Sequence, residues 1–120
     1  MVLPIRLLAA AAVTAALSAG CNKERKQECD RFLAAMTPLD EGVPTAETVN
    51  RVNQDVGALN LQDQPLHIYA ENYQKTLTVL ANTIALKSTD SPPDGTDDVI
   101  KDRLREARTD KEDAVRYCAQ

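Results

Sequence analysis

The sequence predicts an all-α fold, a small antiparallel four-helix bundle stapled by one disulfide. Apolar residues recur at intervals of three and four through four segments of the chain, which is the period of an amphipathic helix. Turns rich in proline and glycine separate these segments. No stretch of useful length alternates apolar with polar residues, as a half-buried strand would. Four helices joined by short connections favour up-down-up-down topology.

The first two predicted helices are short. The first covers residues 23–36 and ends at Thr37-Pro38, because the residue before a proline is displaced from helical backbone angles. After a turn at residues 40–44, Thr45 is the expected N-cap of the second helix. The apolar face of the first helix consists of Cys29, Phe32, Leu33 and Met36. That of the second consists of Val49, Val52, Val56 and Leu59.

The last two predicted helices are longer. Asp63, ahead of Pro65, marks the start of the third helix, which reaches Lys87 or Ser88. Pro92-Pro93 requires a loop from residue 88 to residue 95, after which Thr96 is the expected N-cap of the fourth. Their apolar faces comprise Leu66, Ile68, Tyr69, Tyr73, Leu77, Val79, Leu80, Ile84 and Leu86, and then Val99, Ile100, Leu104, Ala107, Ala114, Val115 and Cys118.

Residues 1–20 have the pattern of a secretory signal peptide. One positive charge at Arg6 precedes an apolar run from Leu7 to Leu17, and small residues follow at 18–20. Positive, apolar and small segments occur in that order in secretory signals. The run is too short for an uncleaved membrane anchor, which needs about 20 apolar residues.

The residues Leu17-Ser18-Ala19-Gly20-Cys21 closely resemble the lipobox of bacterial lipoproteins. The resemblance implies cleavage before Cys21, a diacylglycerol thioether on its sulfur and an acylated new amino group. Two or more acyl chains suffice for stable anchoring, so lipid on Cys21 would hold the protein on a membrane of the bacterial cell envelope. Asn22 favours the outer membrane, since Asp at this position would resemble an inner-membrane retention signal. The alternative is an ordinary secretory signal followed by a cysteine that carries no lipid.

Cleavage leaves residues 21–120, which is the length of a single small domain. With Cys21 lipidated, Cys29 and Cys118 remain, and an even pair in an exported chain predicts a disulfide. In the predicted topology the start of the first helix lies beside the end of the fourth, which brings this pair together. The turn at 40–44 and the loop at 88–95 are then expected at the opposite end, away from the lipid.

Charge and aromatic content narrow the range of partners. The chain carries a net charge of −4, which becomes −5 when Arg6 leaves with the signal peptide. A nucleic-acid partner is not expected, because it requires a basic face, and neither is electrostatic recruitment to anionic lipid. With four aromatic residues and no Trp, a base- or sugar-stacking platform is not expected.

No catalytic constellation and no cofactor site is recognisable. His67 is the only histidine, whereas a metal site needs several converging ligands and a catalytic triad needs a partnered nucleophile. We therefore expect His67 to be an exposed or half-buried residue near a helix start. The sequence contains neither a CxxC redox motif nor a CxxCH haem-attachment motif.

Three groups of residues have both a functional and a structural interpretation. The acidic residues around the proline loop could bind calcium, but Pro92 and Lys101 break the EF-hand pattern, and helix capping explains them. The acidic residues near Cys21 could form a glycosidase pair, but alternating cations favour a solvated, salt-bridged helix face. A tyrosine pair one turn apart could form a binding patch, but its place on an apolar stripe favours the edge of the core. The residues around the proline loop are Asp90, Asp94, Asp97 and Asp98, and those near Cys21 are Glu24, Glu28 and Asp30. The tyrosine pair is Tyr69 and Tyr73.

These observations predict a lipid-anchored envelope protein that acts as a non-enzymatic protein-binding or structural module, with an envelope protein as its partner. The alternative is a carrier or sensor of a small apolar ligand held between the helices. A roomy apolar cavity in the bundle would favour the alternative, and a filled core would count against it.

Overall fold

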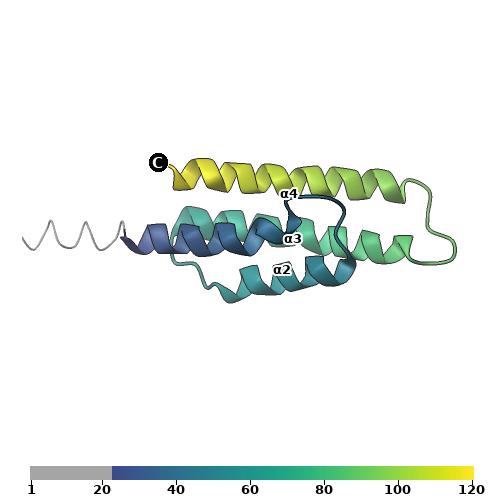
Figure 1. The fold of residues 1–120 in the computed structure, drawn as a ribbon, viewed down its shortest axis with the longest axis horizontal. Helices are drawn as coiled ribbons and strands as arrows, with labels where there is room; N and C mark the ends of the chain where they lie inside the picture. The colour runs from purple at the N-terminus through teal and green to yellow at the C-terminus, as the bar shows by residue number, and fades with distance from the viewer. Residues whose placement is uncertain (1–22) are drawn as a thin grey trace, which may run out of the picture.

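The computed structural model describes residues 23–120, which form an all-helical bundle (Figure 1). A helix over residues 23–36 leads into a short 3₁₀ helix, η1 (Thr37–Leu39). Three further helices follow, α2 (Ala46–Ala58), α3 (Gln64–Lys87) and α4 (Thr96–Cys118). Successive helices run in opposite directions, and α3 packs against both α2 and α4 (Figure 1). The predicted four-helix bundle is confirmed, whereas the predicted signal peptide (1–20) and Cys21 lie outside the described residues.

The starts of two helices are capped as the sequence predicts. The Thr45 hydroxyl accepts a hydrogen bond from the Thr48 backbone N–H at 3.2 Å, and a carboxylate oxygen of Asp63 accepts one from the Leu66 N–H at 3.4 Å. Each satisfies a backbone donor of the first helical turn that has no partner within the helix.

The expected cap of α4 is wrong. Gly95 is the N-cap, with a left-handed backbone (φ 82°) that glycine adopts without steric cost. Thr96 is the first residue of the helix, and its hydroxyl donates to the Pro93 carbonyl at 2.6 Å instead. The threonine therefore closes the proline loop rather than capping the helix.

A single apolar cluster holds the described helices together. Phe32 and Tyr73 meet edge to face at its centre, with ring centroids 6.4 Å apart. The buried apolar members are Cys29, Phe32, Met36, Leu39, Val49, Val52, Val56, Leu61, Leu66, Ala70, Tyr73, Leu77, Leu80, Ala81, Ile100, Leu104, Ala107 and Ala114. The central positions of every predicted apolar stripe are thus confirmed as core.

The predicted edges of those stripes are wrong at five positions. Ile68, Val79, Leu86, Val99 and Val115 are exposed, with 39–49% of each residue accessible to solvent. On α3 the reason is helical geometry: at about 100° per residue, Ile68, Val79 and Leu86 stand on the side opposite Leu77. On α4, Val99 and Val115 flank the buried line through Ile100 and Ala114, at the margins of the contact with the other helices.

The helices differ in length, and this moves one connection from its expected place. α3 and α4 have 24 and 23 residues and are about 35 Å long, whereas α2 has 13 residues. The helix over 23–36 ends beside the middle of α4, where Arg108 hydrogen-bonds the carbonyls of Leu39 and Gly42. Arg108 is about 18 Å along the axis from the start of α4.

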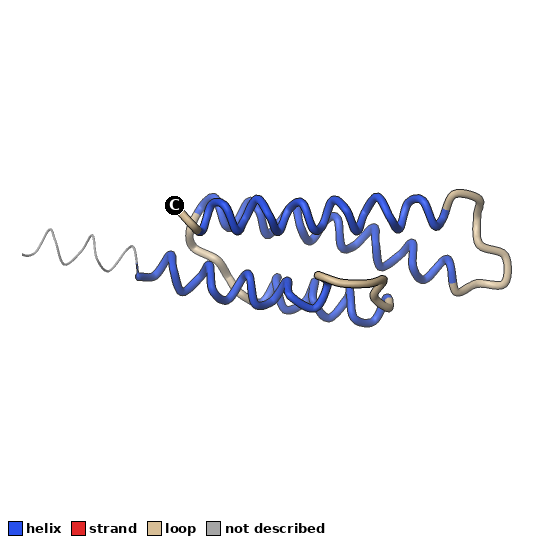
Figure 2. Tube along the Cα trace, turned by 45° about the horizontal axis from the view of Figure 1, so that its top comes forward, coloured by secondary structure: helices blue, strands red, loops and turns tan. Residues whose placement is uncertain are grey.

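The turn at 40–44 therefore does not share the far end of the bundle with the 88–95 loop, contrary to the prediction. Figure 2 shows the connection before α2 turning back well short of the α3–α4 loop. The far end consists of the tip of the α3–α4 hairpin. Among residues 23–120, no helix is both long and apolar enough to cross a membrane.

Candidate functional site

The disulfide joins the ends of the described chain. Cys29 and Cys118, 89 positions apart, are bonded to each other with their Cα atoms 5.9 Å apart, which confirms the predicted pair. Cys29 is buried in the core, and Cys118 is partly buried against it. The bond fixes the helix over 23–36 to the last turn of α4.

An arginine and a tyrosine reinforce the same end of the bundle. The Arg25 guanidinium lies 4.6 Å from the centroid of the Tyr117 ring and donates to the carbonyls of Tyr117 and Gln120 at 3.0 and 3.1 Å. The Tyr117 hydroxyl donates to Asp63 at 2.7 Å, and its ring packs against Tyr69. Partial burial and this hydrogen bond raise the pKa of the Tyr117 hydroxyl.

Glu28 corrects the prediction of a solvated acidic face. Its carboxylate is buried, with 6% of the residue exposed, and accepts from the backbone N–H groups of Gln62 (2.7 and 3.1 Å) and Asp63 (2.9 Å). Glu24 and Asp30 are exposed, as expected. Glu28 therefore ties the first helix to the α2–α3 connection, because a buried carboxylate needs hydrogen-bond donors around it.

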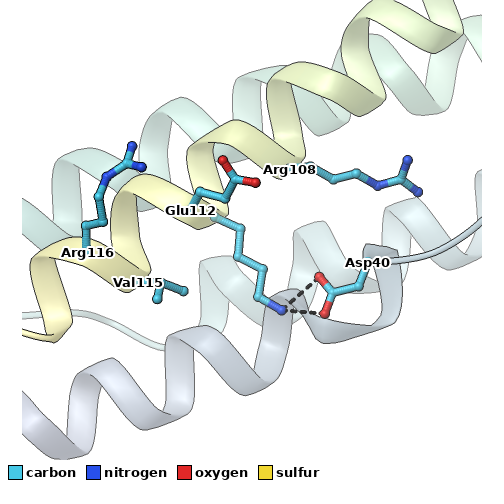
Figure 3. A pocket seen from close by; sticks show the side chains of 6 residues that line it. Asp40, Arg108, Glu112, Val115 and Arg116 are labelled. Carbon is cyan, nitrogen blue, oxygen red and sulfur yellow. Dashed lines mark hydrogen bonds and ion pairs between the residues drawn. The ribbon is translucent and has the colours of Figure 1, made fainter.

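Two adjoining clefts run along the outer side of α4, and Arg108 and Glu112 line both. Figure 3 shows the first, an open cleft of about 470 Å³ between α4 and η1. The second, about 540 Å³, lies beside the turn at 40–44. We call the two together the α4 groove; its lining comprises Asp40, Arg108, Lys111, Glu112, Val115 and Arg116, and Gly42, Val43, Lys101, Leu104, Arg105 and Thr109.

Two cations of the α4 groove are held in different ways. Lys111 forms an ion pair with Asp40 at 2.6 Å, drawn as dashed lines in Figure 3, and only 18% of its side chain is exposed. The Arg108 guanidinium instead donates to two main-chain carbonyls, that of Leu39 at 3.3 Å through Nε and that of Gly42 at 2.6 Å through Nη2. Both contacts fasten the turn after η1 to α4.

The other residues singled out in the sequence have ordinary surroundings. His67 is exposed and lies 2.9 Å from Glu71 one helical turn away, as expected near a helix start. Asp97 pairs with Lys87 at 2.9 Å, and this hydrogen bond lowers the pKa of the carboxyl group. Within residues 23–120, no group of three or more His, Cys, Asp or Glu side chains converges to hold a metal.

Tyr73 is a core residue and not part of a surface patch with Tyr69. It is 1% exposed, and burial, together with the charges of Asp40 and Asp110, raises the pKa of its hydroxyl far above the usual value. Tyr69 is partly buried at the edge of the cluster. Burial also raises the pKa of Asp110, and the neighbouring charges of Glu106 and Asp113 act in the same direction.

The sequence predicts the disulfide but neither the burial of Glu28 nor the α4 groove. No local pattern distinguishes Glu28 from its exposed neighbours, because its partners are backbone groups more than thirty positions away. The α4 groove follows from the early end of the first helix, which the Thr37-Pro38 signal did predict. Comparisons with protein-family models, with curated proteins and with solved structures find no match for this chain.

Proposed function

We propose that this chain is a lipid-anchored protein of the bacterial cell envelope, held in the membrane through Cys21, which binds a protein partner without catalysing a reaction. The observation that carries the proposal is the sequence Leu17-Ser18-Ala19-Gly20-Cys21, preceded by a signal-like segment. The outer membrane is the favoured location, because Asn22 rather than Asp follows the cysteine.

The position of the disulfide supports this arrangement. Cys29 stands eight positions after Cys21, so acyl chains on Cys21 would enter the membrane near the bonded end of the bundle. A disulfide also suits an oxidising compartment outside the cytosol. The α3–α4 hairpin would then project away from the membrane, with its tip about 35 Å from the anchored end.

The open clefts along α4 and the filled core support a binding role. The clefts along α4 are open and lined mainly by charged side chains, a surface suited to a polar partner. The interior between the helices is occupied by the buried apolar cluster, which does not favour the alternative of an apolar-ligand carrier. A rigid, disulfide-closed scaffold can present such a surface at low entropic cost.

The anchor is tested by Cys21→Ser in the full-length protein, followed by metabolic labelling with a fatty acid and separation of membrane from soluble fractions. We expect loss of label and release from the membrane. Asn22→Gln serves as the matched control, because it alters the adjacent residue and keeps the sulfur. Unchanged membrane retention of the Cys21→Ser protein would refute lipid anchoring at this residue.

The partner is tested by photo-crosslinking in cells. A photoreactive residue replaces Val43 or Val115 on the α4 groove, Leu86 near the hairpin tip, or Ile68 on the opposite side of α3 as a control. We expect a discrete protein adduct from at least one of the first three positions and none from Ile68. Absence of any adduct, together with a co-purifying apolar molecule, would replace the binding proposal with the carrier alternative.

A further inference from the structure

We propose that the α4 groove binds an acidic segment of another protein, with Arg108 as the central contact. This inference rests on the proposed function, because it names the surface by which an anchored binding protein would hold its partner. It is carried by the shape of the groove, by how Arg108 is held, and by the charge of the lining residues.

The groove exists because the first helix is shorter than α4. The helix over 23–36 and η1 run beside the half of α4 nearest the disulfide, and the chain then leaves through the turn at 40–44 toward α2 (Figures 1 and 2). The α4 residues that line the groove between α4 and residues 40–43 extend from Lys101 to Arg116, a length of about 22 Å. That length accommodates a helix of several turns or a short extended segment.

Arg108 is oriented before any partner arrives. Two main-chain carbonyls accept from its Nε and Nη2, so the guanidinium is held in place. Both acceptors are neutral, and within the described chain no carboxylate forms an ion pair with Arg108, so its positive charge has no carboxylate partner. Three of its five N–H donors remain available. A fixed guanidinium with free donors matches the two oxygens of a carboxylate, and little rotamer freedom is lost on binding.

The charge around Arg108 has the sign that an acidic segment requires. Five cations and two carboxylates line the groove, a net charge of +3, although the whole chain carries −4. Carboxylates on or beside the groove pair with Lys111 (Asp40), Arg105 (Asp102) and Arg116 (Asp113), so within residues 23–120 the lining cations without an ion pair are Lys101 and Arg108. An acidic partner would be steered to this side of the molecule and away from the rest of the surface.

Apolar side chains at both parts of the groove favour a protein ligand. Val43, with 66% of the residue exposed, lines the cleft beside the turn, and Val115, 45% exposed, lines the cleft nearer the disulfide. An acidic segment with apolar residues among its carboxylates would cover both. A lipid headgroup layer would meet the end of the bundle near Arg116 rather than the length of its side.

The test uses full-length protein purified from membranes in nonionic detergent and a fluorescein-labelled poly-L-glutamate probe, with binding followed by fluorescence anisotropy at low and physiological salt. The groove variants are Lys101→Gln/Arg105→Gln and, separately, Arg108→Gln. The matched control is Arg51→Gln/Lys75→Gln, which removes the same charge from exposed positions on α2 and α3. Circular dichroism establishes that each variant is folded; the Lys101/Arg105 pair is exposed and does not fasten the turn.

We expect Lys101→Gln/Arg105→Gln to weaken binding of the probe roughly fivefold to tenfold, and Arg108→Gln to weaken it by about tenfold or more. The control should change affinity less than about twofold. Equal losses in the control and the groove variants would overturn the inference, because attraction would then depend on overall charge. Absence of probe binding at low salt would also overturn the inference, because the groove would then have no affinity for a chain of carboxylates.

Failure of the groove is distinguishable from failure of the proposed function. If crosslinking in cells recovers a partner from the hairpin tip and the Lys101→Gln/Arg105→Gln change leaves that adduct intact, the groove inference is wrong and the binding function stands. If the adduct forms from Val43 or Val115, is lost in the same variant, and maps to an acidic stretch of the partner, both are supported.

Discussion

Glu28 is the side chain whose role depends most on tertiary structure. It sits on an otherwise charged and exposed stretch, yet its carboxylate is enclosed and receives hydrogen bonds from two successive backbone N–H groups ahead of α3. A carboxylate that is buried in this way stabilises the fold only while those donors are in place. The first helix and the α2–α3 connection therefore depend on each other.

Glu28→Gln should lower the free energy of unfolding by about 1–3 kcal/mol, because one charge-assisted acceptor is replaced by an amide whose N–H₂ faces backbone donors. Glu24→Gln, one turn earlier and exposed, should change it by less than about 0.5 kcal/mol. Urea denaturation of both variants measures the difference. Equal effects would show that Glu28 contributes no more than a surface carboxylate.

The raised pKa values of Tyr73 and Tyr117 make the stability of the fold depend on pH. The pKa of Tyr73 is raised, chiefly by burial, and that of Tyr117 is raised in the same direction. A raised pKa means that the folded state retains the hydroxyl proton where the unfolded state loses it, so stability is complete below about pH 10 and falls as the pH rises further.

By about pH 11, Tyr73 alone should remove about 1.4 kcal/mol of stability relative to pH 8. Tyr73→Phe keeps the ring and has no proton to lose, so its stability should decline less over the same interval. Urea denaturation at the two pH values measures both proteins. An identical decline in the variant would contradict the assignment of this pH dependence to Tyr73.

The sequence predicts those helix ends that local signals set. It does not predict how wide the buried apolar face of each helix is. Thr45 and Asp63 cap their helices through hydrogen bonds to residues three positions on, a contact that the sequence contains entirely. Gly95 rather than Thr96 is the N-cap of α4, because the left-handed backbone at the glycine sets where the helix begins. Val115 is predicted to lie in the core but is exposed, because burial at the margin of an apolar face depends on how far the neighbouring helices extend, which no local window of the sequence contains.

The α3 cap is expected to be worth more than the α2 cap. Asp63 accepts from Leu66 and also from the Tyr117 hydroxyl, which links α3 to the end of α4. The hydrogen bonds of Thr45 within residues 23–120 all go to the start of its own helix. Asp63→Ala should therefore cost about 2 kcal/mol and Thr45→Ala about 1 kcal/mol.

A double-mutant cycle separates the two contributions of Asp63. Asp63→Ala and Tyr117→Phe, measured singly and together by urea denaturation, should give a coupling energy of about 1 kcal/mol. Strictly additive losses would mean that the Tyr117–Asp63 hydrogen bond does not contribute to stability and that Asp63 acts only as a cap.

Closing the loop between Cys29 and Cys118 is expected to stabilise the folded domain. Closing a loop of 89 positions contributes roughly 4–5 kcal/mol in the chain-entropy account, against a total of about 5–15 kcal/mol for a typical domain. The same bond sets the shape of the protein, because it fixes the first helix against the last turn of α4 and leaves the α3–α4 hairpin free to extend beyond it.

Reduction should lower the melting temperature by on the order of 20 °C. Cys29→Ser/Cys118→Ser should melt at the temperature of the reduced protein and should not respond to reductant. Thermal melts by circular dichroism, with and without a phosphine reductant, measure both. A shift of less than about 5 °C would mean that the apolar cluster alone accounts for the stability.

We propose that the three cysteine sulfurs react in two ways, by attachment of lipid at Cys21 and by formation of the Cys29–Cys118 disulfide, and the intact mass of the protein extracted from bacterial membranes reports on both. We predict a chain that begins at residue 21, carries the added mass of a diacylglycerol and an amide-linked acyl chain on its first residue, and is two hydrogens lighter than the fully reduced form. A chain that retains residues 1–20 or lacks acyl mass would contradict the anchoring, and two free thiols at Cys29 and Cys118 would contradict the closure of the bundle.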